Sequence, residues 1–405
     1  MSGGPTEPPK GTTDSASSSS MPPKKSNAGM WAAVAVVIVI IVVIGGAYAA
    51  GLFGKSSTPS GQNCPTGVSG QAVSGQGSTF VYPLMTYWST ASSLPCGISL
   101  QYLGVGSGAG IAALTTKSVD FGASDAPLNP TQKAALPHAA VTIPEAIGSV
   151  TVMYNIPGVK TGLNLTGDIV AGIYLGLITN WNVTQITSIN PSIKIPNQAI
   201  TTVHRADSSG TTFAFTSYLK LVNTTWASKV GSGTTVVWPL TGIASKGSTG
   251  VAGQVASLPG AIGYAELNYA ALGNVPYAKL QNSAGIYILP NAASTAAAAA
   301  AVAGSLPAGT GDWGNVSMLN QAGSGTYPLA TFTYMMVYSD LGVTYGSSMT
   351  QAHATALVQF LYWAVNSGQS ASGGLFYVPL PSQVVTVDDA SIAGILYNGA
   401  SLTSH

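Results

Sequence analysis

The residues best suited to chemistry lie in one stretch, His204–Thr212, whose sequence is HRADSSGTT. Arg205 is the only arginine of the chain, and its planar fork of donors fits a carboxylate or a phosphate two hydrogen bonds at a time. Asp207 lies close enough in sequence to hold that fork in place. The Ser209–Thr211 segment then opens an expected helix, whose first backbone N–H groups are free to bind an anion. The stretch therefore predicts an anion site. The alternative is a surface ion pair beside an ordinary helix cap.

Two more loops share this design. Gly77–Phe80 and Gly106–Gly110 each follow an expected strand and open an expected helix, so that hydroxyls and N–H groups gather at a helix start. Three such loops and one arginine can converge on a tetrahedral anion. Of 13 basic and 12 acidic residues, three and two lie before residue 54, which leaves ten of each in the rest of the chain. Selectivity for an anion must therefore come from local dipoles and hydrogen bonds.

Asp125 is the unexpected member of this group, because a carboxylate repels an anion. It suits a ligand that carries a proton, since a protonated phosphate oxygen can donate a hydrogen bond to Asp125 and a fully ionised sulfate cannot. A buried carboxylate without that partner would penalise the wrong anion. The alternative role for Asp125 is to cap the turn before Pro127.

The surrounding sequence alternates short β-branched runs with helical stretches, which predicts an α/β fold with ligand sites at the carboxyl ends of strands. Two longer apolar runs, Ala140–Tyr154 and Thr331–Tyr338, are expected to be buried strands that cross between lobes, the first of them as a strand pair. The other expected strands are 71–74, 98–103, 119–122 and 200–204, and the expected helices are 80–92, 111–117, 166–178, 292–303 and 351–365.

The N-terminal part predicts a membrane anchor. Residues 1–29 have the composition of a disordered tail, and residues 30–53 carry no charge over a length that spans a bilayer. Lysines before this segment place the N-terminus in the cytoplasm and the rest of the chain outside the cell, as a single-pass membrane protein. Residues 54–69 are a linker by composition. The alternatives are a buried soluble helix and a pilin-type signal cut near Gly29.

The chain has two cysteines, Cys64 and Cys96. In an oxidising exterior they can form a disulfide that ties the end of the linker to the first folded unit. Two free buried thiols are the alternative.

Composition and motifs disfavour other functions. A net charge of +1, with 6% charged residues, gives no basic surface for nucleic acid. The four histidines are scattered without metal-ligand spacing, so we expect neither a metal nor a cofactor. The spacing of Gly104, Gly106 and Ala109 fits a dinucleotide loop only loosely. Strand alternation points His204 and Arg205 to opposite faces, which disfavours catalysis, and we expect no enzyme.

Six ordered motifs resemble the phosphate-binding protein of the Pst phosphate ABC importer family, over about residues 72–385. They are GQGSTFVYPLMTYW, YLGVGSGAGIAALTTKSVDFGASDAPL, LTGDIVAGIYLGLITNWN, HRADSSGTTFAFTSYL, LPGAIGYAELNYA and YPLATFTYMMVY. The resemblance implies a type II periplasmic-binding-protein fold, with two α/β lobes joined by two crossover strands. On this reading, residues 70–148 and 328–405 form lobe 1 and residues 149–327 form lobe 2.

The resemblance also implies a function and a set of contacts. The expected function is extracellular binding of inorganic phosphate and its delivery to the permease subunits of an ABC importer. The implied ligand residues are Ser78, Thr79, Phe80, Ser107, Asp125, Arg205, Asp207, Ser209, Gly210 and Thr211, with Asp207 orienting Arg205. The sequence departs from the family in its anchor, its low charge and Ser208, where glycine is common. The alternatives are the same fold binding sulfate or arsenate, a surface phosphate-ester hydrolase, and a purely structural surface protein.

Overall fold

The computed structural model describes residues 1, 3–4 and 64–402. The expected anchor, nearly all of the expected tail and most of the linker lie outside these residues. Within the described part of the chain, no helix is both long and apolar enough to cross a bilayer.

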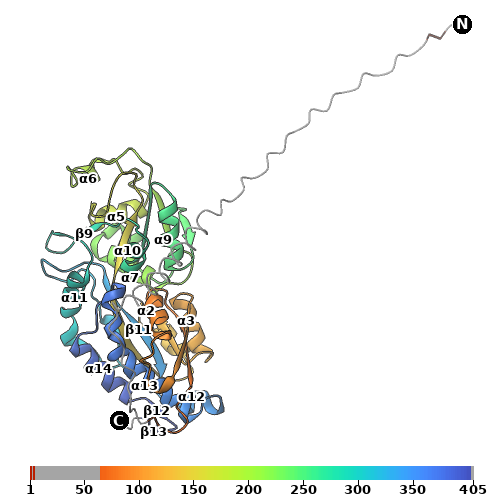
Figure 1. Ribbon diagram of the computed structural model, residues 1–405. Coiled ribbons are helices and arrows are strands. Elements are labelled where there is room, and N and C mark those ends of the chain that lie inside the picture. Colours follow the sequence, from red (N-terminus) through yellow and green to blue (C-terminus); the bar gives the residue numbers. More distant parts are fainter. Residues whose placement is uncertain (2, 5–63, 403–405) are drawn as a thin grey trace.

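One eight-stranded sheet runs through the whole folded part (Figure 1). Its strands, in spatial order, are β2 (Ser99–Gly104), β1 (Ala72–Gly77), β3 (Phe121–Ser124), β11 (Ala330–Tyr338), β4 (Ala140–Tyr154), β8 (Ala261–Glu266), β6 (Thr201–Arg205) and β7 (Ile243–Ser245). Two small sheets flank it, formed by β5 (Asn164–Leu165), β9 (Lys279–Gln281) and β10 (Tyr287–Ile288), and by β12 (Leu396–Tyr397) and β13 (Ala400–Ser401). The prediction of an α/β fold is confirmed.

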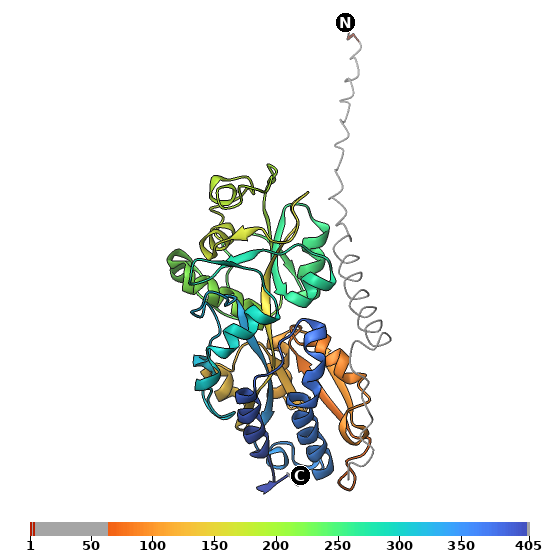
Figure 2. The same ribbon diagram turned by 60° about the vertical axis from the view of Figure 1, so that its left-hand side comes forward.

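The long strand β4 links two halves of the molecule. Its first part pairs antiparallel with β11, and Val150–Tyr154 pairs antiparallel with β8. The views in Figures 1 and 2 both show this strand passing from one half into the other. All of β4 except Ala140 is buried, which explains its nearly unbroken apolar sequence. The expected strand pair is thus a single 15-residue strand.

Helices cover both halves. The first half holds α2 (Tyr82–Ser89), α3 (Ser107–Thr115), α4 (Pro130–Ala135), α12 (Leu341–Tyr345), α13 (Gln351–Val365) and α14 (Ser382–Ala393), around β1, β2 and β3. The second half holds α5 (Gly167–Tyr174), α6 (Thr184–Thr187), α7 (Gly210–Val222), α8 (Thr224–Lys229), α9 (Gly247–Ser257) and α10 (Leu267–Leu272), around β6, β7 and β8. The alanine-rich run forms α11 (Ala292–Ala300), as its composition predicts.

Hydroxyl and amide side chains fix where several helices begin. Ser209 caps α7 by accepting a hydrogen bond from the amide of Thr212, Thr166 caps α5 through Ile169, and Asn291 caps α11 through Ser294. One expected helix is displaced: α2 begins at Tyr82, with Pro83 in its first turn, so Thr79 and Phe80 precede the helix and do not open it.

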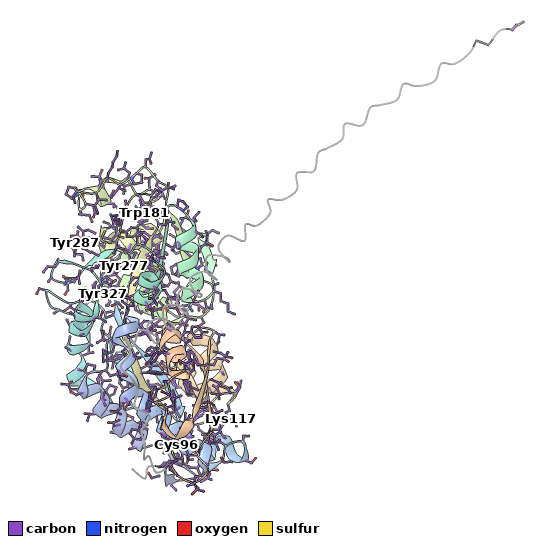
Figure 3. All side chains as sticks on the ribbon, viewed as in Figure 1. Cys96, Lys117, Trp181, Tyr277, Tyr287 and Tyr327 are labelled. Carbon is purple, nitrogen blue, oxygen red and sulfur yellow. A yellow bond between two sulfur atoms is a disulfide. The ribbon has the colours of Figure 1, made fainter. Side chains whose placement is uncertain are left out.

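Cys64 and Cys96 form a disulfide, with their Cα atoms 5.6 Å apart. Figure 3 shows Cys96 near Lys117 at the outer end of the first half, whereas Trp181, Tyr277, Tyr287 and Tyr327 lie in the opposite part of the molecule. The disulfide therefore fastens the start of the continuous segment 64–402 at a point remote from the second half.

Candidate functional site

Strand ends from both halves meet at one place. In the first half β1 is parallel to β2 and β3, so the carboxyl ends of these strands lie at one edge of the sheet. In the second half β6 is parallel to β7 and β8, and their carboxyl ends form a matching edge. Hydrogen bonds join the two edges, because the amide of Gly210 donates to the hydroxyl of Ser107 at 3.0 Å and the amide of Gly108 donates to the carbonyl of Ser208 at 3.1 Å. The halves are closed on each other.

Arg205, the last residue of β6, is the cation of this region. Its Nε and Nη2 donate to the two carboxylate oxygens of Asp207, at 2.9 and 2.5 Å. Its Nη1 points the other way and donates to the hydroxyls of Ser248 at 3.1 Å and Thr211 at 3.4 Å. The Arg205 side chain is 1% exposed, so the pair is a buried, oriented fork and not a surface ion pair. Asp207 thus holds the guanidinium of Arg205 in one orientation, and the roles of both residues toward a ligand stay predictions.

Electrostatics keep this pair charged. Burial on its own would lower the pKa of Arg205, but the hydrogen bonds and charge of Asp207 outweigh it and raise that pKa. For Asp207, burial raises the pKa, but the guanidinium outweighs this effect and lowers it overall. Arg205 therefore brings an oriented donor to the site while most of its charge is already compensated.

Asp125 follows β3 and faces the second half. The hydroxyl of Ser78 donates to its Oδ1, and the hydroxyl of Thr211 lies 3.3 Å from its Oδ2. The turn before Pro127 is instead held by Ser124, whose hydroxyl donates to the carbonyl of Ala126 and accepts from its amide. The Asp125 side chain is thus directed into the site and does not cap that turn.

The pKa of Asp125 reflects this position. Burial first and the charge of Glu266 second raise it to about 7, against the opposing effects of hydrogen bonds from Ser78 and Thr333 and of the charge of Arg205. No ion pair of residues 64–402 includes Asp125. A carboxyl of this kind can give or accept a proton near neutral pH.

The remaining predicted residues lie around the same point. Ser107 is the first residue of α3, and its hydroxyl also lies 3.4 Å from the amide of Asp125. The hydroxyl of Thr79 lies 3.0 Å from that of Ser248, and the amide of Phe80 donates to the hydroxyl of Ser78. The structure therefore brings together the residues that the sequence predicted to contact the ligand. Each of them is buried except Asp207, which is half-buried.

Glycine is required where the halves touch. A Cβ added to Gly210 would lie 2.6 Å from the backbone nitrogen of Asp125. Gly106 has a φ of 104°, and a Cβ there would lie 2.3 Å from a carboxylate oxygen of Asp207. These glycines allow the helix starts and the two carboxylates to approach closely.

Sequence reasoning missed two residues of the site, Ser248 and Glu266. Ser248 lies in the first turn of α9 and bonds both Thr79 and Arg205. Glu266 ends β8 and accepts a hydrogen bond from Thr211 at 2.6 Å. Signals for both were present, since Ser248 follows a strand in a Lys-Gly-Ser-Thr-Gly loop and Glu266 is a single acid at the end of an apolar strand.

Residues considered for other chemistry do not join this cluster. The ring of His204 stacks on Trp238, with centroids 4.7 Å apart, and its Nδ1 lies 3.1 Å from the carbonyl of Arg205. This arrangement agrees with the expected opposite orientation of His204 and Arg205. Among the residues that the structure describes, no group of three or more His, Cys, Asp or Glu side chains could hold a metal ion.

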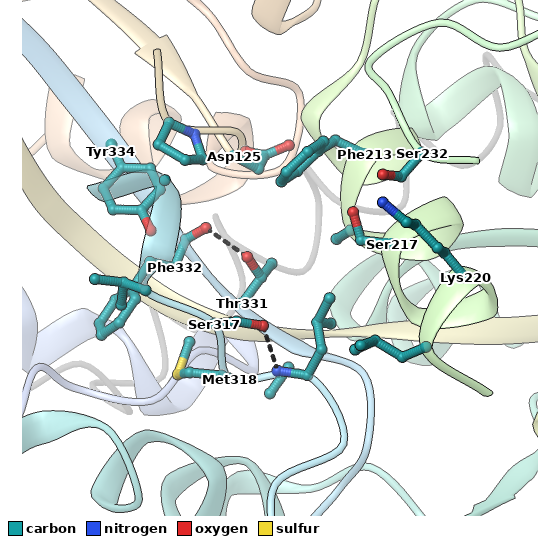
Figure 4. Close-up of a pocket in the computed structure, with 17 residues that line it drawn as sticks. Asp125, Phe213, Ser217, Lys220, Ser232, Ser317, Met318, Thr331, Phe332 and Tyr334 are labelled. Carbon is teal, nitrogen blue, oxygen red and sulfur yellow. Dashed lines mark hydrogen bonds between the residues drawn. The ribbon is translucent and has the colours of Figure 1, made fainter. Parts of the chain in front are cut away.

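A cavity of about 220 Å³ lies beside the site, between α7 and β11 (Figure 4). Asp125 and Pro127 line one end of it, and Phe213, Lys220 and Tyr334 are among the residues of its walls. The cavity marks the cleft between the two halves on the side of Asp125.

Comparison with known proteins gives the class first. Residues 56–367 match the model of the PBP superfamily domain. A solved structure of a human phosphate-binding apolipoprotein superposes with a TM-score of 0.61 at 22% identity, over 79% of this chain and 94% of that one. Fold and site thus define a bilobed binding protein of the PBP superfamily.

Two relatives with known names identify the family within this superfamily. The phosphate-binding protein PstS of Xylella fastidiosa (strain Temecula1) is 37% identical over 350 residues, which cover 81% of this chain and 90% of that protein. The phosphate-binding protein PstS of Methanocaldococcus jannaschii is 35% identical over 352 residues, which cover 82% and 88%. The chain belongs to the PstS family of phosphate-binding proteins.

Proposed function

We propose that this protein binds inorganic phosphate between its two halves and delivers it to the permease subunits of a phosphate ABC importer. The observation that carries the proposal is the position of Asp125, a buried carboxyl aimed into a site whose donors otherwise suit an anion. When the Asp125 carboxyl is ionised, an anion binds beside it only if the anion supplies a proton to the contact. Phosphate does so across the physiological pH range, and the names of the PstS relatives support the assignment.

The geometry assigns roles to the surrounding groups. Arg205 Nη1, now turned to Ser248 and Thr211, is the donor that would be redirected to the ligand. The amide of Gly210 and the hydroxyl of Ser107, now bonded to each other, would each turn to a phosphate oxygen. Hydrogen bonds between the halves thus occupy the positions that the ligand would take. The remaining contacts would come from Ser78, Thr79, Phe80, Asp125, Ser209 and Thr211.

Binding requires the halves to separate, because the closed site is buried. Residues 70–148 with 328–405 would move as one lobe and residues 149–327 as the other, with β4 and β11 as the crossover strands between them. The cavity beside Asp125 lies where such a cleft would open. The sequence of residues 30–53 supports a membrane anchor that holds this binding domain outside the cell, next to its permease.

Titration calorimetry of the full chain tests the proposal. At a fixed pH well above the pKa of Asp125, we expect tight binding of phosphate and at least about a thousandfold weaker binding of sulfate, because sulfate leaves the Asp125 carboxylate buried against a second anion. Comparable affinities for the two anions would contradict the role of Asp125. Because arsenate is protonated like phosphate, it serves as a positive control for the proton requirement.

A further inference from the structure

Glu266 is a second buried carboxyl at the proposed phosphate site. It ends β8 in the second half, whereas Asp125 reaches the same point from the first half. Its Oε1 accepts from the Thr211 hydroxyl at 2.6 Å, while its Oε2 is buried without a hydrogen-bond partner. A buried carboxylate oxygen without a partner is costly, which makes Glu266 a candidate for protonation or for direct contact with the anion.

Hydrogen-bond counting at Thr211 shows that protons are scarce here. The hydroxyl of Thr211 has one proton and lies near two carboxyls, 2.6 Å from Glu266 and 3.3 Å from Asp125. It also accepts from Arg205 Nη1. One hydroxyl proton can serve only one acceptor. If it turns to Asp125 or to a phosphate oxygen, the 2.6 Å contact is a hydrogen bond only if Glu266 carries its own proton and donates it to Thr211.

The charges around the site also require that one of the two buried carboxyls carries a proton. Arg205 is paired with Asp207, and no ion pair of the described residues includes Glu266. The titratable groups around Glu266 are Asp125, which follows β3, Arg205 at the end of β6 with its partner Asp207, Tyr269 from α10, and Tyr377 near the C-terminus. Of these, only Arg205 is a cation. An anion entering next to two ionised carboxylates would face repulsion that one paired arginine cannot offset.

Burial raises the pKa of Glu266, even though hydrogen bonds from Thr211 and Ser248 and the charge of Arg205 oppose this effect. The direction agrees with the geometry, because the closed site disfavours a second charged carboxyl. In the open protein the same side chain would meet water and ionise as an ordinary glutamate.

We propose that Glu266 takes up a proton from solvent when the site closes on phosphate, so that the complex holds one proton more than the Asp125 contact alone requires. This inference rests on the proposed phosphate binding. Glu266 is then a positioning residue: in its neutral form it keeps Thr211 in place and adds no negative charge beside the ligand. Phosphate binding is therefore linked to proton uptake, and alkaline conditions favour release.

Calorimetric titration of the full chain with inorganic phosphate, from about pH 6 to 9, tests this linkage. One extra proton makes the association constant of the wild type fall by up to about tenfold per pH unit at the alkaline end. Glu266→Gln preserves the shape and the contact with Thr211 but cannot take up the proton. Its association constant for phosphate should therefore vary less with pH than that of the wild type, and the two curves of association constant against pH should cross. Asp388→Asn is the matched control, since Asp388 is another buried, unpartnered carboxyl, on α14. It should retain the wild-type profile.

Parallel profiles for the wild type and Glu266→Gln would overturn the proposal, because a purely structural role weakens binding equally at every pH. If the variant does not fold, titration of the wild type in buffers of different ionisation enthalpy counts the protons directly. Uptake of about one proton near pH 9 supports the proposal, and no uptake refutes it. Absence of phosphate binding by the wild type would instead refute the proposed function.

Discussion

The amide of Gly210 donates to the hydroxyl of Ser107 at 3.0 Å, and this bond joins the helix start of one half to the helix start of the other. Both groups belong to the predicted phosphate site, so the closed structure satisfies them with each other. A ligand has to replace this bond with contacts of its own. The affinity for phosphate therefore depends on how well each group around the site is oriented toward the anion.

Arg205→Lys tests the orienting pair. Lysine preserves the charge but loses the planar fork, and it cannot bond both oxygens of Asp207 while also reaching the ligand. We expect a loss of about 2–3 kcal/mol in phosphate binding free energy, measured by calorimetry. Lys133→Arg, at an exposed ion pair, is the control and should bind like the wild type. Unchanged affinity in Arg205→Lys would mean that Arg205 has no contact with the ligand.

Asp125→Asn tests discrimination between anions. Asparagine can still accept a hydrogen bond from a protonated ligand, but its amide can also donate to an unprotonated one. We expect sulfate binding to strengthen far more than phosphate binding changes. The ratio of the two dissociation constants is the measurement. Asp312→Asn, at an exposed carboxylate, is the control, and a ratio that stays at the wild-type value in Asp125→Asn would contradict the assigned role.

Gly210→Ala tests the closed arrangement. Alanine suits the helix α7, but its Cβ would lie 2.6 Å from the backbone nitrogen of Asp125 in the opposite half. Closure over the ligand should therefore be impaired, with phosphate affinity reduced by about 1–3 kcal/mol and little change in melting temperature. Gly304→Ala is a matched control, because a Cβ at Gly304 meets no atom within 4 Å. Equal affinities in the two variants would show that the halves can close without this contact.

The pair of His353 and Asp120 should make stability depend on pH. His353 Nε2 lies 3.0 Å from Asp120 Oδ2, and this hydrogen bond raises the pKa of His353 above its ordinary value of 6.5, although burial opposes the shift. A raised pKa in the folded state gives stability that is complete below 6.5 and is lost as pH rises through the folded value. The melting temperature of the wild type minus that of His353→Asn, measured from about pH 5.5 to 8.5, should decrease as the pH rises. A constant difference would mean that the ion pair adds nothing.

The sequence was most informative where chemistry is carried by residue type. A single arginine followed by an aspartate two positions later indicated the fork, since the planar guanidinium fits a carboxylate with two hydrogen bonds. The long apolar run 140–154 indicated a buried strand, because β4 is covered on both faces. The prediction for residues 30–53 lies outside the described residues and remains a prediction.

The two residues that the sequence did not predict, Ser248 and Glu266, reach the site only through the tertiary fold. Glu266 and Arg205 are separated by about sixty residues in sequence and become neighbours only because β8 and β6 are adjacent and parallel. Ser248 follows β7, a strand of three residues that is too short to give a periodic pattern. The start of α2 was placed too early because the hydroxyls of the Gly77–Phe80 loop resemble a helix cap, whereas the chain bends at residues 79–81 before α2 begins at Tyr82.

The pairing of Arg205 with Asp207 also bears on the rate of capture. A binding site with a bare cation attracts anions from a distance, and added salt slows that attraction. Here the guanidinium charge is matched by Asp207, and the chain from residue 54 onward carries ten acidic and ten basic residues. Phosphate should therefore arrive by unassisted diffusion, at a rate that hardly changes with ionic strength. Such a protein would collect its ligand equally well in dilute and in saline surroundings.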